Sequence, residues 1–504
     1  MLKLFGGKPD HPMADPKEVR RILDDLPSLD PHKALDELSH WHESVSAVEG
    51  FRFEQRLGLH LQIDEAAQPR VRRLSRDYFA ATRPSRFQET RLWTVIHGYW
   101  QQAGLAYAKV VDSLIQSPKA GDSVKTQIPL LYVRTLRSLA QRIKWMHLRY
   151  GPIDMAVWGI LNNVYSLAEA RKLADTKVAV YPNSAEATPR DEFVRALLFS
   201  ASSPNSLLPV EIEIAERVIG ECVSRVTLSN APGKEFSYWI DLTQAMGPLR
   251  LTKPPAPTPG LRFLATGAAL ETLAETERKL RSAVAGAPAG ADGREDPETA
   301  LDVTQHLALY WSPEPPERKS PRHAVKSRLT VVAGFEAVLH ALDANASRSL
   351  NFDANAGESW IVENVSAGGF GAAVPQLKGD WLKIGALLAL QPEGGSNWLI
   401  GTVRRVNKVG GQQARVGIQT LSRAPLAGIF RLAGSGAEEA GIALPSGDSS
   451  SAEIRLVLRP GVFAPAQNLE SERDGRMHVY MPLGIAERGD DYEILRFREM
   501  VREG

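Results

Sequence analysis

Hydrophobic positions recur every three or four residues over the first half of the chain, from about residue 16 to residue 247. This spacing places apolar side chains on one face of a helix. Residues 91–115 are expected to form one long helix, and residues 135–150 carry an apolar stripe that predicts another. The first half is therefore predicted to be an all-α region.

Arginines flank that second stripe, and they raise the question of whether the helical region binds nucleic acid. A run of charge along a helix is usually a solvated face, and we favour that interpretation over a nucleic-acid patch. The four arginines concerned are Arg134, Arg137, Arg142 and Arg149.

One helical spacing is similar to a known repeat. Trp158, Leu161 and Tyr165 lie where the first helix of a tetratricopeptide repeat has its consensus residues. The pattern does not recur one repeat length later, and such arrays need roughly three repeats for a continuous core. We therefore predict a helical bundle outside the repeat classes.

Alternating apolar and polar residues replace the helical spacing in the last third of the chain. The strand-like runs are residues 329–335, 360–371, 398–405 and 415–421. Similar alternation returns in residues 452–458, 478–482 and 492–498, which are either a second small β unit or an extension of the first. The fold class is α+β multidomain, with an all-α region before antiparallel β structure.

Proline, glycine and composition give the predicted boundaries. Residues 253–260 are rich in proline and are expected to be a stiff linker. Two further helices are expected at residues 264–284 and 297–311. The predicted domains are a helical domain (1–252), a linker with helices (253–316), a β-barrel domain (317–425) and a C-terminal β-rich segment (426–504).

The bulk composition limits the possible partners and compartments. With 60 Lys+Arg against 59 Asp+Glu, the chain lacks the basic excess of a protein that holds nucleic acid by its phosphates. The single cysteine, Cys222, is expected to be a buried core residue, and its isolation fits a reducing compartment. No apolar run approaches the ~20 residues of a membrane span. We expect a cytoplasmic protein.

The candidate chemistry is concentrated around the first strands of the β region. Arg318 and Arg322 precede the first strand, and the turn that contains Asn364, Ser366 and Gly369 lies between two later strands. A guanidinium can grip a phosphate or the O6/N7 edge of guanine with two parallel hydrogen bonds. Glycine allows a ligand to approach the main chain closely. The alternatives are solvated linker charges and an ordinary hairpin turn.

In order and placement these two elements resemble the PilZ domain, a small β-barrel that binds the bacterial second messenger cyclic di-GMP. The resemblance covers residues 317–423. It implies that Arg318 and Arg322 bind phosphate and guanine, and that Asn364, Ser366 and Gly369 line the other side of the ligand. No cofactor is implied besides this ligand.

The function that follows from the resemblance is a cyclic di-GMP effector in which ligand binding reorients the helical region toward an unidentified protein partner. The alternative is a scaffold for protein–protein interactions whose barrel has lost the nucleotide. No catalytic motif is recognisable in the helical region, so we do not expect an enzyme.

His40 and His42 are two residues apart on different helix faces and do not predict a metal site. Arg404 and Arg405 lie on one strand, so at most one of them is expected to face the ligand.

Overall fold

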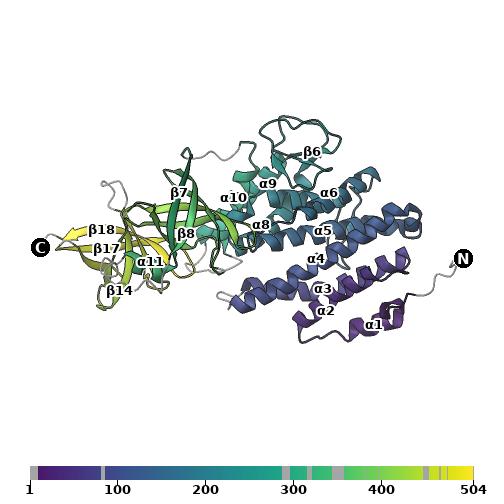
Figure 1. Ribbon diagram of the computed structural model, residues 1–504, viewed down its shortest axis with the longest axis horizontal. Coiled ribbons are helices and arrows are strands. Elements are labelled where there is room, and N and C mark those ends of the chain that lie inside the picture. Colours follow the sequence, from purple (N-terminus) through teal and green to yellow (C-terminus); the bar gives the residue numbers. More distant parts are fainter. Residues whose placement is uncertain are drawn as a thin grey trace. The chain divides into compact units, whose positions relative to one another are not determined.

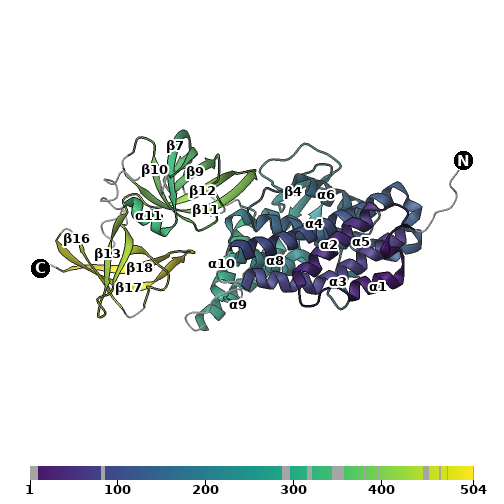
Figure 2. The same cartoon turned by 60° about the horizontal axis from the view of Figure 1, so that its bottom comes forward.

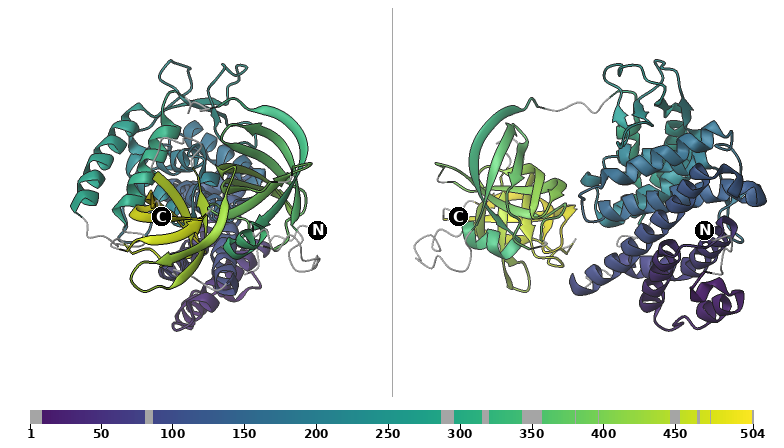
Figure 3. Two further views of the ribbon diagram at one scale, coloured as in Figure 1. Left: turned by 90° about the vertical axis from the view of Figure 1, so that its left-hand side faces the viewer. Right: turned by 45° about the vertical axis from the view of Figure 1, so that its right-hand side comes forward.

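The chain folds into two compact units in a computed structural model. Its described residues are 9–80, 86–286, 296–314, 320–342, 357–379, 381–395, 397–445, 453–464, 467–473 and 475–502. The first unit consists of Met1–Arg149, Ile153–Pro204 and Pro209–Pro316, and the second of Tyr150–Pro152, Asn205–Leu208 and Glu317–Gly504. Figure 3 shows the first unit in purple to teal and the second in green to yellow. The finer division at residues 252, 316 and 425 stays a prediction.

The first unit is a bundle of helices, as the spacing of its apolar residues predicts. Several helices begin with a proline behind a capping side chain, and Thr188 and Asp191 form a full capping box at the start of α7. The helices are α1 (Pro16–Asp24), α2 (Pro31–Ala47), α3 (Phe53–Ala80), α4 (Arg86–Gln116), α5 (Ile128–His147), α6 (Met155–Ala170), α7 (Pro189–Ala201), α8 (Pro209–Cys222), α9 (Gly267–Gly286) and α10 (Pro297–Trp311).

Helix α5 is the centre of this bundle (Figure 1). It packs against α4 on one side and against α6 and α7 on the other. The expectation of a solvated arginine face was wrong for two of the four arginines, because this helix is enclosed on most sides. Arg134 is 1% exposed and Arg142 is 8% exposed. Cys222 is fully buried, as expected.

A small sheet interrupts the helices and changes the role of the proline-rich stretch. It consists of β3 (Thr227–Ser229), β4 (Tyr238–Asp241), β5 (Leu249–Arg250) and β6 (Leu261–Ala265), in the order β3-β6-β4-β5. Residues 253–260 therefore connect two strands of one sheet. Leu264, the expected first residue of a helix, ends up in β6, and α9 begins at Gly267. A separate two-stranded pair is β1 (Val178–Ala179) with β2 (Glu186–Ala187).

The second unit contains two closed antiparallel barrels. The strands of the first are β7 (His323–Ala333), β8 (Glu358–Ser366), β9 (Gly369–Val374), β10 (Leu387–Pro392), β11 (Leu399–Gly410) and β12 (Gln413–Ser422). Around the barrel they follow the order β7-β8-β9-β12-β11-β10. A short helix that the sequence did not predict, α11 (Phe335–Leu342), follows β7. The expected long hairpin loop at residues 343–357 lies almost wholly outside the described residues.

The C-terminal strands form a second, separate barrel, which decides between the two alternatives left open by the sequence. The strands are β13 (Leu426–Leu432), β14 (Glu438–Leu444), β15 (Glu453–Leu458), β16 (Leu469–Arg473), β17 (Arg476–Arg488) and β18 (Glu493–Arg502). Around the barrel they follow the order β13-β14-β15-β18-β17-β16. Each strand therefore has the same neighbours as the corresponding strand of the first barrel.

An apolar cluster joins the two barrels, and α11 lies at this junction (Figure 2). From the first barrel it takes Leu387 and Ala389 on β10 and Ile400 on β11. These side chains point away from the interior of their own barrel, which is filled by a different cluster that contains Trp360 and Leu388. From the second barrel the junction takes a row of paired residues on β14, β15 and β18, namely Ile442, Val457 and Ile494. The predicted fold class is confirmed.

Candidate ligand-binding site

The predicted binding turn is the tight β8–β9 hairpin of the first barrel. Ser366 and Gly369 are the last paired residues before the two-residue turn Ala367–Gly368. The neighbouring strand β12 and the residue after it fix the turn. The backbone N–H of Thr420 donates to the carbonyl of Gly368 at 3.0 Å, and the Arg423 guanidinium donates to that of Ala367 at 3.0 Å. The turn is therefore held in place on its main-chain side.

Asn364 lies at one end of a row of residues that crosses four strands on the outer face of the barrel. Its partner on β9 is Gly371, which pairs with Gly417 on β12, which in turn pairs with Arg405 on β11. A Cβ on Gly371 would lie 2.6 Å from the amide nitrogen of Asn364, and one on Gly417 would lie 3.2 Å from the Cβ of Arg405. The row is thus a glycine floor with a polar side chain at each end.

A second row runs parallel to the first and contains the other two motif residues. Ser366 pairs with Gly369, Gly369 with Gln419 on β12, and Gln419 with Thr402 on β11. Gly369 has a φ of +155°, and a Cβ there would lie 1.9 Å from the carbonyl oxygen of Ile418. Only glycine fits at this position. The two rows are about 7 Å apart, since each residue of a strand rises about 3.3 Å.

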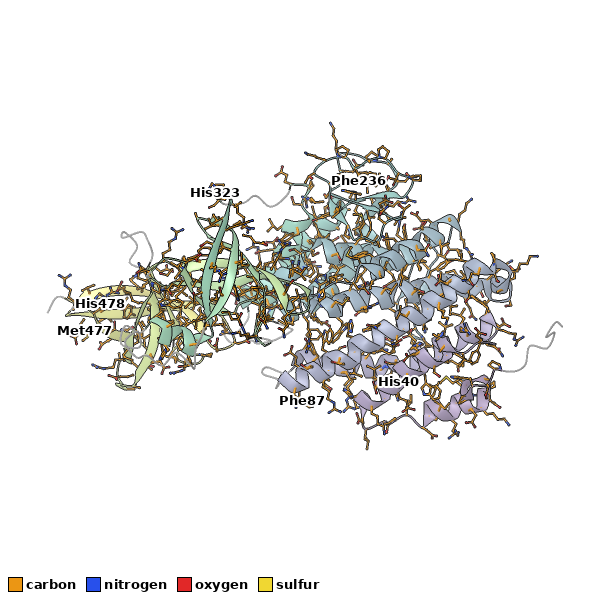
Figure 4. All side chains as sticks on the ribbon, in the orientation of Figure 1. His40, Phe87, Phe236, His323, Met477 and His478 are labelled. Carbon is orange, nitrogen blue, oxygen red and sulfur yellow. The ribbon has the colours of Figure 1, made fainter. Side chains whose placement is uncertain are left out.

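Of the two predicted arginines, the structure describes one. Arg322 is exposed and immediately precedes β7, whose first residue His323 is labelled in Figure 4. His323 pairs with Val365 and Ala324 pairs with Asn364. Arg322 therefore directly precedes the residue that pairs with Val365 of the motif strand β8. Arg318 lies outside the described residues.

The expectation that Arg404 and Arg405 point to opposite faces was wrong, and a β-bulge is the reason. The register of β11 shifts between Val403 and Arg405, which leaves Arg404 as an extra residue. Arg405 covers Gly417 on the outer face. Arg404 reaches the same face, where its Nε donates to the Oε1 of Gln419 at 2.7 Å. Both arginines thus lie on the face that carries Asn364, Ser366 and Gly369.

The face has a surplus of guanidinium groups. Among the described residues, Arg322 and Arg405 have no ion-pair partner, whereas Arg415 pairs with Glu363 at 3.4 Å and Arg404 pairs with Glu487. The buried amide oxygen of Asn364 accepts no hydrogen bond from any described residue. Guanidinium groups beside a flat glycine floor can bind phosphates and leave room for a base to lie close to the main chain.

The sequence did not single out the floor itself or Arg405. Gly369 and Gly371 are two residues apart, so they leave the same face of a strand without side chains. This spacing could have predicted the glycine floor from the sequence. The pairing of Gly371 with Gly417 could not be inferred from the sequence, because Gly417 lies 46 positions further along the chain.

The tryptophans of this barrel contribute packing. Trp360 is fully buried in the barrel and stacks on Trp381 at a centroid distance of 5.9 Å. Both indole N–H groups donate to Glu358, at 2.9 and 3.1 Å. Trp398 packs against the cluster between the barrels.

A buried polar cluster in the first unit is the main alternative candidate for a metal-binding or ligand-binding site. His40 is exposed, whereas the Nδ1 of His42 lies 3.0 Å from the Nδ1 of His60 in the core. Burial lowers the pKa of His42 to about 4 and that of His60 well below its usual range. No group of three or more metal-ligating side chains occurs in the described part of the chain. We find no ligand chemistry in this cluster.

None of the described helices is both long and apolar enough to cross a membrane.

Two family models match the chain. Residues 17–233 match the model described as the N-terminal domain of the cyclic-di-GMP receptor FimW, and residues 353–427 match that of its middle PilZ domain. The second match covers Asn364, Ser366 and Gly369 and begins after both predicted arginines. No curated protein matches the chain.

Proposed function

We propose that this chain, a PilZ-domain protein of a cyclic di-GMP receptor family, binds cyclic di-GMP on the outer face of its first barrel and passes the signal to a protein partner. The observation that carries the proposal is the pair of parallel rows on β8, β9, β12 and β11. They bring Asn364, Ser366 and Gly369 onto one glycine-floored face with Arg405.

The binding step uses the charge surplus of that face. Arg318 and Arg322 supply two guanidinium groups from the segment before β7, and Arg405 supplies a third from β11. A cyclic dinucleotide has two phosphates and two guanine bases, so several planar cations can each take a separate part of it. Asn364 and Ser366 offer hydrogen bonds at the end of the floor opposite Arg405.

The signalling step is an ordering of the segment that carries Arg318 and Arg322. Ligand that engages both arginines fixes this segment against the barrel, and the first unit then moves relative to the second. The extent of the movement is limited by the difference in ligand affinity between the two arrangements. We propose that the helical region presents the surface that the partner recognises, that the protein acts in the cytoplasm without catalysis, and that its output lies in motility or biofilm formation.

Calorimetric titration of cyclic di-GMP into the full-length protein tests the binding step. We expect tight binding by the wild type and its loss in the double variant Arg318→Ala/Arg322→Ala. Arg431→Ala is the matched control, since Arg431 is an exposed arginine of the second barrel that pairs with Glu438. Binding that survives the double variant would keep the function and reject these two residues.

The absence of binding by the wild type would favour the second candidate, a scaffold for protein–protein interactions with a barrel that does not bind nucleotide. The same arginine variants would then leave partner binding unchanged.

A further inference from the structure

We propose that Glu487, a carboxylate of the second barrel, sets the ligand affinity of the first barrel by competing with the ligand's phosphates for Arg404. This inference rests on the proposed function and adds a regulatory residue to it. It assigns the second barrel a direct electrostatic effect on a site that lies on its neighbour.

Arg404 stands beside the proposed ligand floor. The β11 bulge turns it to the outer face, where its Nε donates to Gln419. Gln419 pairs with the motif residue Gly369 on the neighbouring strand β9, so Arg404 contacts the side chain that borders the motif glycine. A phosphate that lies over the glycines is therefore within reach of Arg404.

Glu487 already occupies the binding edge of this arginine. Its two carboxylate oxygens accept from the two terminal nitrogens of Arg404, Oε1 at 2.9 Å and Oε2 at 2.5 Å. A parallel pair of charge-assisted bonds is the geometry by which arginine also binds phosphate, so carboxylate and phosphate need the same edge. The Glu487 side chain is 22% exposed, which leaves the pair open to solvent and to a competing anion.

The second barrel holds Glu487 in place. The residue follows a bulge of β17 and pairs with Ile494 of β18. Tyr492 donates its hydroxyl to the carbonyl of Gly385 in the first barrel at 2.7 Å, and the same hydroxyl lies 3.5 Å from the Oε1 of Glu487. Burial, and then the charge of Glu487, raise the pKa of Tyr492, so this hydroxyl keeps its proton.

Two effects of Glu487 then oppose the binding of an anionic ligand. The carboxylate neutralises a guanidinium that would otherwise bind phosphate, and its charge repels phosphate directly. Glu487→Gln removes the charge and keeps the size and an acceptor oxygen. We expect this variant to bind cyclic di-GMP about three- to tenfold more tightly at low salt, with a smaller gain at high salt.

The test is calorimetric titration of cyclic di-GMP into the full-length wild type, Glu487→Gln and Glu438→Gln. The last is the matched control, because Glu438 loses the same charge in the same barrel and its partner, Arg431, lies within that barrel. Circular dichroism checks that each variant is folded. Tighter binding by Glu487→Gln with an unchanged Glu438→Gln supports the proposal, and so does binding by Glu487→Gln alone.

A double-variant cycle with Arg404→Gln shows whether the effect passes through Arg404. In the Arg404→Gln background only the direct repulsion remains, so Glu487→Gln is expected to give a clearly smaller gain in affinity there, and a gain of undiminished size would overturn the competition. Unchanged or weaker binding by the single variant Glu487→Gln would also overturn it while the wild type still binds. If neither wild type nor Glu487→Gln binds, the proposed function fails and this inference fails with it.

Discussion

Single side chains decide what the outer face of the first barrel can do. Gly371 and Gly417 keep the floor low, and Gly369 allows the backbone of β9 to lie against β12. Asn364 and Arg405 stand at the two ends of the floor because neither glycine has a side chain to displace them. The face is therefore sensitive to the addition of one methyl group.

Gly371→Ala separates binding from folding. The new Cβ would lie 2.6 Å from the end of the Asn364 side chain, which can rotate away at little cost to stability. We expect ligand affinity to fall about tenfold, the value of roughly one lost hydrogen bond, while the unfolding midpoint changes little. Calorimetry and urea unfolding measure the two quantities. Gly368→Ala is the control, since nothing lies within 4 Å of a Cβ there, and equal losses in both variants would contradict the prediction.

His147 makes stability depend on pH. It is half-buried at the end of α5 against Phe199, and desolvation lowers its pKa from 6.5 to about 4. The unfolded chain binds the proton more tightly, so this stability is complete above pH 6.5 and is lost as the pH falls toward 4. The loss amounts to as much as about 3 kcal/mol, at about 1.4 kcal/mol per pKa unit.

Urea unfolding at about pH 7 and at about pH 4.5 measures this loss. His147→Gln is expected to be less stable at neutral pH but to lose less stability on acidification than the wild type. His40→Gln, at an exposed position on α2, should keep the wild-type pH dependence. An undiminished loss in His147→Gln would show that other groups cause it.

At the level of elements, the helical bundle depends on one buried carboxylate. Asp64 of α3 is fully buried and accepts hydrogen bonds from Tyr99 and Tyr107 of α4 at 2.5 and 2.9 Å. Arg134 of α5 donates to it at 3.3 Å and also holds the Val180 carbonyl after β1 at 2.9 Å. Three helices and a strand segment therefore share one ionic network.

Arg134→Met should destabilise the bundle strongly. It leaves Asp64 charged and buried without its cation, a change that costs roughly 3–5 kcal/mol. Arg281→Met is the matched control, because Arg281 forms an exposed pair with Glu277 on α9 that is worth less than about 1 kcal/mol. Urea unfolding followed by circular dichroism compares the two, and similar midpoints would reject a structural role for the network.

The sequence predicted the type of most elements and missed how distant ones meet. Helix α10 begins and ends at the predicted residues, because a capped proline and a regular apolar stripe specify it locally. Arg134 looked like a surface residue because its partner Asp64 lies 70 positions earlier. In the site, the turn was recognisable from a short motif. The positions of Gly417 and Arg405 at the opposite end of the floor depend on the pairing of β12 and on the β11 bulge. No local sequence pattern predicts either feature.

At the level of the molecule, the second barrel buries an apolar surface of the first barrel. Leu387, Ala389 and Ile400 lie on its outer side and are at most 1% exposed because the second barrel packs over them. The Lys383–Asp490 and Arg404–Glu487 pairs also join the two barrels. A chain that stopped at residue 425 would expose this apolar face.

A fragment of residues 317–425 should therefore be less stable than one of residues 317–504. Exposing a large apolar side chain costs roughly 1.5–3 kcal/mol, and several are involved. Urea unfolding and the binding of a hydrophobic dye compare the two fragments. Equal stability and no dye binding in the shorter one would show that the first barrel is an independent domain.

The two barrels share one strand order, and the same surface of that topology has different surroundings in each. The row Ile442–Val457–Ile494 and the row Asn364–Gly371–Gly417 both cross the second, third and sixth strands of their barrels. In the first barrel this surface carries a polar side chain and two glycines, whereas in the second it is aliphatic and packs against the first barrel. One topology therefore provides a candidate binding surface in one barrel and a supporting surface in the other.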